Sequence, residues 1–138
     1  MQTAANTTTS EAVFSGREDA AVQRLADYLH AAEREGTLSA RTIHNAWQAW
    51  SALEKALRDE AGALLPVPDA CPGAGGQLLY TWRRGEHYLE LEVFAAHPAE
   101  LFYRNGKTGA LWEDELAIAA EGDGTVTPQI TAKLALFV

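Results

Sequence analysis

The residues best suited to chemistry lie in one short stretch, which contains Glu86, His87, Glu90 and Glu92. In an extended strand every second side chain points the same way, roughly 7 Å apart, so Glu86, Tyr88, Glu90 and Glu92 share a face. Carboxylates at that spacing can hold a divalent cation or act as acid and base. His87 points to the other face, however, and the histidines of the chain show no metal-binding spacing. A solvated acidic strand that discourages aggregation is the preferred explanation, and we predict no catalytic, cofactor-binding or metal-ligating residues.

The acidic character extends well beyond this strand. Between residues 86 and 123 the chain has nine acidic residues and two basic ones, Arg104 and Lys107. Aromatic residues are interleaved with them, as on a surface that binds a basic protein. An ordinary sheet with buried aromatic residues has the same composition, so both interpretations stay open. The predicted partner-binding residues are Glu86, Tyr88, Glu90, Glu92, Phe94, Glu113, Asp114 and Glu115.

Length, charge and cysteine content narrow the class of protein. A chain of 138 residues fits one domain. The net charge of −8 disfavours nucleic acid and anionic membranes as partners and favours a basic protein. No apolar stretch approaches the ~18 residues of a membrane span. The single cysteine and the polar N-terminus, which lacks a secretion signal, indicate a cytoplasmic protein.

The first half of the chain predicts a helical hairpin over residues 17–62, preceded by a flexible arm at 1–16. Apolar residues recur at three- and four-residue spacing over 17–35 and again over 40–61. Ser39 is suited to cap the second helix, and Gly62 to end it. Trp47 and Trp50 are expected to pack on a sheet rather than to stack on a ligand.

Residues 63–76 predict a loop. Three prolines and four glycines occur between residues 62 and 76, a composition that excludes regular structure. A phosphate-binding loop is excluded because a strand, and not a helix with a lysine, follows the glycines. Cys71 is interpreted as a small buried residue.

Period-two alternation predicts a sheet over residues 77–116. Turn residues at 84–87 and 105–109 separate its strands, which indicates an antiparallel meander of three or four strands. Residues 116–120 either finish the last strand or form a helical turn. Thr127 and Pro128 then begin a C-terminal helix over 128–138. The fold class is therefore α+β, a single domain over 17–138 with helices on one face of the sheet and the other face partly wet.

The segment 68–93 resembles small bacterial proteins of unassigned function. Those proteins share a proline-rich loop, a Gly-Gly pair, a strand ending in Trp, a turn with glycine, and a Leu-Glu-Leu-Glu strand. The matching residues are Pro68, Pro72, Gly75, Gly76, Leu78 to Trp82, Gly85, and Leu89 to Glu92. The resemblance implies a bacterial origin and attaches no activity.

The leading expectation is a non-enzymatic protein that binds a basic partner and can neutralise it, as antitoxins, immunity proteins and inhibitors do. One alternative is a small enzyme or ligand-binding protein with its site between helices and sheet, near Trp47, Trp50 and Cys71. Another is a structural subunit of a bacterial assembly, in which the helical hairpin forms a homo-oligomer. No cofactor is expected.

Overall fold

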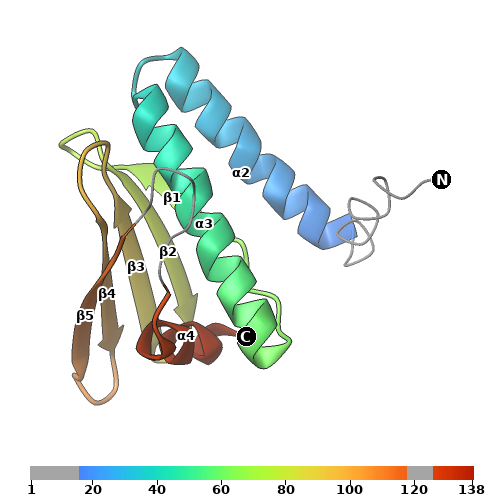
Figure 1. Cartoon of the computed structure of the whole chain (residues 1–138), viewed down its shortest axis with the longest axis vertical. Coiled ribbons are helices and arrows are strands. Elements are labelled where there is room, and N and C mark those ends of the chain that lie inside the picture. The colour runs from blue at the N-terminus through green and yellow to red at the C-terminus, as the bar shows by residue number, and fades with distance from the viewer. Residues whose placement is uncertain (1–15, 118–125) are drawn as a thin grey trace.

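Helices on one side of an antiparallel sheet make up the structure, a computed structural model that describes residues 16–117 and 126–138. Two helices come first, α2 (Gly16–Arg34) and α3 (Ala40–Ala61). The strands follow: β1 (Asp69–Pro72), β2 (Leu78–Arg84), β3 (His87–Val93), β4 (Ala99–Asn105) and β5 (Leu111–Leu116). The chain closes with α4 (Pro128–Leu134) and the 3-10 turn η1 (Ala135–Phe137). α3 lies between α2 and the sheet, and α4 lies on the same side at one end of the sheet (Figure 1).

Local signals place the ends of α3 where the sequence predicts them. The Ser39 hydroxyl accepts a hydrogen bond from the Thr42 backbone N–H at 3.1 Å and caps the first turn. Gly62 ends the helix at φ 62°, a left-handed conformation that a residue with a Cβ adopts only at a cost, and its N–H bonds to the Arg58 carbonyl. α2 begins and ends one residue before its predicted bounds.

Strands β2, β3 and β4 alternate between buried residues and more exposed ones, and the buried side of the sheet packs on α3. Its strands are ordered β1-β2-β3-β4-β5, each antiparallel to the next. Leu89, Leu91 and Val93 of β3 are each no more than 1% exposed. Tyr80 of β2 is also buried and donates its hydroxyl hydrogen bond to the Ala46 carbonyl of α3 at 3.3 Å. The predicted α+β class, with helices covering one sheet face, is therefore confirmed.

The strand count differs from the prediction, because the sheet has five strands and not three or four. The additional strand is β1, which lies inside the region 63–76 that was predicted to be a loop without regular structure. β1 is an edge strand, and its Pro72 is the last residue. An edge strand tolerates proline there because one side of it needs no backbone donor. Cys71 in this strand is exposed, so the prediction that it is buried was wrong.

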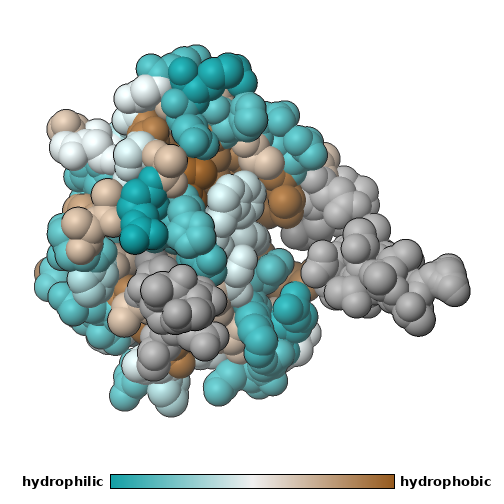
Figure 2. Space-filling view, turned by 45° about the horizontal axis from the view of Figure 1, so that its top comes forward, coloured by the Kyte–Doolittle hydropathy of each residue, from teal (hydrophilic) through white to brown (hydrophobic). Residues whose placement is uncertain are grey.

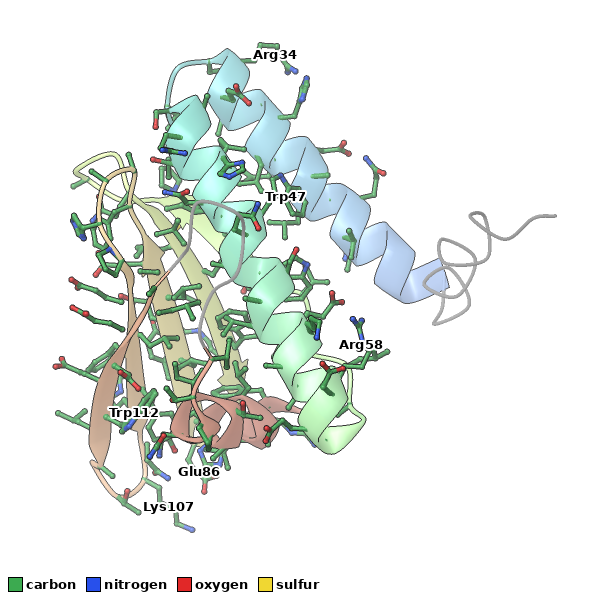
Figure 3. All side chains as sticks on the ribbon, in the orientation of Figure 1. Arg34, Trp47, Arg58, Glu86, Lys107 and Trp112 are labelled. Carbon is green, nitrogen blue, oxygen red and sulfur yellow. The ribbon has the colours of Figure 1, made fainter. Side chains whose placement is uncertain are left out.

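The C-terminal helix docks against the end of the sheet. Thr127 accepts a hydrogen bond from the Ile130 N–H at 3.3 Å, as its predicted capping role requires. The C-terminal segment buries Ile130, Leu134 and Phe137. Lys133 covers the rings of two sheet residues, with its Nζ 4.4 Å from the Tyr103 centroid and 5.7 Å from the Trp112 centroid. Trp112 accordingly lies beside α4 (Figure 3).

Three sequence expectations concern the remaining segments. The predicted arm lies outside the described residues except for Gly16, which begins α2. Leu116 ends β5, whereas residues 118–120 are again outside the described part. Trp50 is buried in the core, whereas Trp47 is half-buried against that core on the side of α3 toward α2 (Figure 3). The prediction that both tryptophans pack on the sheet therefore stays untested for Trp47. Within the described ranges, no helix combines the length and the apolarity that crossing a membrane requires.

Replacing one leucine on each face of the sheet tests which face contributes to the stability of the fold. Leu91 is 0% exposed, so Leu91→Ala should lower the free energy of unfolding by about 2–5 kcal/mol in urea denaturation. Leu111 is 64% exposed, and Leu111→Ala should change that free energy by less than about 0.5 kcal/mol. Equal losses in the two variants would contradict the assignment of the buried face.

Candidate functional site

The sheet side that faces away from α3, here called the outer face, presents three cross-strand rows of side chains. Oxygen-tipped side chains project from this side of the sheet (Figure 3). Strand pairing across β2, β3, β4 and β5 defines the rows. The basic row is Arg83, Tyr88, Arg104 and Leu111. The middle row is Thr81, Glu90, Phe102 and Glu113, and the acidic row is Leu79, Glu92, Glu100 and Glu115.

The acidic row places three carboxylates side by side. Glu100 pairs with Glu92 on one side and with Glu115 on the other. Like charges directly opposite each other destabilise a sheet, and two unit charges about 5 Å apart repel by roughly 0.8 kcal/mol even in water. Among the residues that the structure describes, no lysine, arginine or histidine forms an ion pair with these three carboxylates. The row is therefore an electrostatic cost that the described part of the chain leaves uncompensated.

Neutral hydrogen bonds hold two of the outer carboxylates in place. Gln77 donates through Nε2 to Glu92 Oε2 at 3.1 Å. The Tyr88 hydroxyl donates to Glu90 Oε1 at 2.7 Å. Both glutamates are half-buried. These bonds orient the carboxylates without neutralising them, so their charge stays available to a cation.

Tyr88 occupies a different environment from the glutamates beside it. The Arg83 guanidinium lies 4.7 Å from its ring centroid, and the Arg104 guanidinium lies 5.2 Å from it. Partial burial, then the hydrogen bond to Glu90 and the charge of that carboxylate, raise the pKa of Tyr88 to about 12, although the two arginines act to lower it. At neutral pH the hydroxyl therefore stays protonated and serves as a donor to Glu90.

A groove of about 690 Å³ runs over β3, β4 and β5 on this side of the sheet. The outer-face residues that line it are Glu90, Glu92, Glu100, Phe102, Glu113 and Glu115. Leu101 and Asp114 also border it, although strand pairing assigns their side chains to the helix-facing side. Its volume is in the range of ligand pockets, but those are lined mainly by apolar side chains. Carboxylates dominate here, so the groove suits a cationic segment better than an apolar ligand.

The described surface has little exposed apolar area that could serve as an alternative binding site. Leu111 and Val138 are the large hydrophobic residues that are exposed within the described ranges. In the view of Figure 2, hydrophilic residues cover most of the visible surface, and hydrophobic ones emerge in small separate areas. Recognition through the described surface would thus depend on charge and hydrogen bonding more than on apolar burial.

The structure brings together five of the eight residues that the sequence assigned to partner binding. Those that lie on the outer face are Tyr88, Glu90, Glu92, Glu113 and Glu115.

Three of the predicted residues lie elsewhere. Glu86 is in the β2–β3 turn, at the end of the sheet that also holds Lys107 (Figure 3). Phe94 follows β3, stacks on His97 with ring centroids 4.0 Å apart, and offers its carbonyl to Asn45 of α3. Asp114 had been grouped with its neighbours, but it pairs with buried Leu101 and so belongs to the helix-facing side.

Sequence reasoning missed residues of β4 that complete the outer face. Glu100 sits at the centre of the acidic row, and Phe102 at the centre of the middle row. The sequence indicates only the apolar middle of this strand, Leu101 to Tyr103, whereas β4 spans Ala99–Asn105. The alternation of Glu100, Phe102 and Arg104 is a signal of the longer strand, but Pro98 just before it suggested an interruption.

The histidine and cysteine of the sheet do not join a reactive site. His87 points to the helix side as predicted, where Nδ1 shares a 2.6 Å hydrogen bond with the Tyr103 hydroxyl and the ring contacts Phe137. Exposed Cys71 pairs with Leu79 at the edge of the sheet. Across residues 16–117 and 126–138, no group of three or more His, Cys, Asp or Glu side chains is arranged to hold a metal ion.

Comparison with known proteins does not identify the chain. No protein-family model matches it, and neither a curated protein nor a solved structure shows significant similarity. The resemblance of residues 68–93 to small bacterial proteins therefore stays a prediction.

The acidic row predicts that neutralising its central residue stabilises the protein. Glu100→Gln removes two cross-strand repulsions and should raise the free energy of unfolding by about 0.5–1 kcal/mol at low ionic strength, with less gain in 0.5 M salt. Asp69→Asn is the matched control, because Asp69 is exposed on the same side but pairs with Thr81. A destabilised Glu100→Gln variant, or an equal gain from Asp69→Asn, would show that the row carries no such repulsion.

Tyr88 predicts a second electrostatic effect. Glu90→Gln removes the carboxylate that accepts its hydrogen bond, so the pKa of Tyr88 should fall from about 12 toward 10. Because the folded pKa is raised, the corresponding stabilisation is present below pH 10 and is lost as the pH rises toward 12. Ultraviolet titration of the phenol, assigned with Tyr88→Phe, measures the change. An unchanged titration curve would rule out the coupling to Glu90.

Proposed function

We propose that this chain is a non-enzymatic interaction module that binds a basic protein through the outer face of its sheet. In this proposal it acts in the bacterial cytoplasm and blocks its partner, as an antitoxin, immunity protein or inhibitor does. The observation that carries the proposal is the acidic row, in which Glu92, Glu100 and Glu115 lie side by side without an ion pair in the described structure.

Folding alone gives no reason for this arrangement. A threonine or lysine at position 100 would protect the sheet surface equally well and would remove the repulsion on both sides of Glu100. A basic partner would supply the missing positive charge and convert the repulsion into attraction on binding. The repulsion that destabilises the free protein is then removed in the complex.

The surface also suits fast association. Glutamates of two adjacent rows and the groove between β3 and β5 concentrate negative potential on one side of the molecule. Such a field accelerates encounter with a basic protein, and the acceleration falls as salt screens the charges. Rapid capture is the property that a neutralising protein needs.

The space between helices and sheet gives the enzyme alternative no support. Trp50, Leu53 and Tyr80 fill it, each no more than 5% exposed. Thr42 and Thr131 are the buried polar residues among those described. An active site needs convergent polar groups in a cavity of roughly 300–1,000 Å³. The cavity between α2 and β1, whose lining includes Arg24, Tyr28 and Asp69, is smaller than this at about 230 Å³. A structural subunit that assembles through α2 and α3 stays a prediction that no observation favours.

Neutralising the acidic row should abolish recognition of the partner. A triple variant with Glu92→Gln, Glu100→Gln and Glu115→Gln should lose a basic protein that the wild type captures from a lysate of the source organism. Once that protein is identified and purified, its Kd for the triple variant should be at least about tenfold higher, mainly through slower association at low salt.

A helix-layer variant controls for net charge. Glu33→Gln, Glu35→Gln and Glu60→Gln remove the same number of charges from exposed positions of the helical layer, and they should leave capture unchanged. If the acidic-row variant retains the partner with wild-type affinity, the outer face is not the binding surface.

A further inference from the structure

The two aromatic rings of the outer face differ in how their surroundings supply positive charge. Both guanidiniums near Tyr88 come from its own chain, at 4.7 Å and 5.2 Å from the ring centroid. Phe102 lies in the adjacent row and meets Tyr88 edge-on, with centroids 6.5 Å apart. Within the described residues no lysine or arginine covers the Phe102 ring. The Tyr88 ring is therefore covered by two guanidiniums of the same chain, whereas the Phe102 ring is covered by none within the described residues.

Carboxylates surround the ring that lacks a cation. Strand pairing places Glu90 on one side of Phe102 and Glu113 on the other, and Glu100 precedes it by two residues on the same face. Phe102 is half-buried and lines the groove together with these glutamates. A cation over this ring would meet a π-face below it and carboxylates at its sides, both of which stabilise positive charge.

Resting on the function proposed above, we propose that Phe102 is the docking position for an arginine side chain of the basic partner. Arginine fits better than lysine because a guanidinium is planar, stacks on an aromatic face and donates several hydrogen bonds in its own plane. Those donors can reach the carboxylates of Glu90 and Glu113 at once. The ammonium of lysine is a compact point charge that cannot do both equally well.

Row spacing extends the proposal to the neighbouring residues of the partner. Adjacent rows are roughly 7 Å apart, the distance between alternate side chains of an extended segment. An arginine on Phe102 therefore places the side chain two residues away over the acidic row of Glu92, Glu100 and Glu115, where a second basic residue fits. In the opposite direction the segment meets Arg83 and Arg104, which disfavour a basic residue. The docking segment is thus extended, with arginine and a second basic residue at alternate positions.

Two short peptides test the arginine preference without altering the protein. The probes are Ala-Arg-Ala-Arg-Ala and Ala-Lys-Ala-Lys-Ala, each acetylated and amidated, added to ¹⁵N-labelled protein at low salt. Backbone amide shifts on β3, β4 and β5 report binding. The arginine peptide should bind about three- to tenfold more tightly than the lysine peptide, with its largest shifts around Phe102. Equal affinities would overturn the proposal.

A variant separates the ring from the charge. Phe102→Leu keeps an apolar side chain and every carboxylate, so it should reduce arginine-peptide affinity to about that of the lysine peptide and weaken the lysine peptide much less. Phe94→Leu is the control, because Phe94 is a half-buried aromatic residue that lies outside the three rows, and it should retain the preference. If the Phe102→Leu variant still prefers the arginine peptide over the lysine peptide, the carboxylates alone cause that preference.

The outcomes distinguish this inference from the proposed function. If both peptides bind the outer face equally and the acidic-row variant loses both, the acidic face stands as a binding surface and the role of Phe102 is wrong. If neither peptide shifts the amides of β3 to β5 at millimolar concentration, both proposals fail.

Discussion

Burial of every second side chain of β3 is the constraint on which the rest of the structure depends. Leu89, Leu91 and Val93 lie against the helices at no more than 1% exposure. A register slip of one residue would exchange them for Tyr88, Glu90 and Glu92. Burying unpaired carboxylates costs several kcal/mol each, so the slipped arrangement is strongly disfavoured. The core thereby fixes the position of every charge on the other side of the sheet.

The same register creates the tension on the outer face. Because β3, β4 and β5 are held in place by their buried residues, Glu92, Glu100 and Glu115 must stand next to one another. The protein tolerates this repulsion because the buried face contributes far more stability than the outer face costs. A surface can thus keep a charge pattern that opposes folding when a partner makes use of it. Tyr88 with Arg83 and Arg104 shows that the same sheet also holds cations against an aromatic ring.

Local sequence signals were sufficient for the elements that have strong periodicity or caps. The α3 helix, capped by Ser39 and ended by Gly62, and the alternation of β3 were both predictable from types and spacing of residues. β1 was not, because three prolines and four glycines mark irregular structure and only its pairing with β2 shows a strand. That pairing is a tertiary contact, which cannot be predicted from the composition of the segment.

The candidate site was predictable only strand by strand. Alternation along β3 placed Glu90 and Glu92 together, but it says nothing about which residue of β4 stands beside them. The cross-strand register shows that Glu100 and Phe102 belong to the candidate site. The same register shows that Asp114 does not. A run of three acidic residues in β5 looks uniform in the sequence, whereas the pleat divides it between two faces.

Zero-length cross-linking in a lysate of the source organism tests the central claim most directly. A carbodiimide joins a carboxylate to a lysine amine that it touches, so the linked residues identify the contact surface. The account predicts links from Glu90, Glu92, Glu100, Glu113 and Glu115 to lysines of one basic protein. Links to a partner that start only from carboxylates of α2 and α3, with the outer face unmodified, would contradict it.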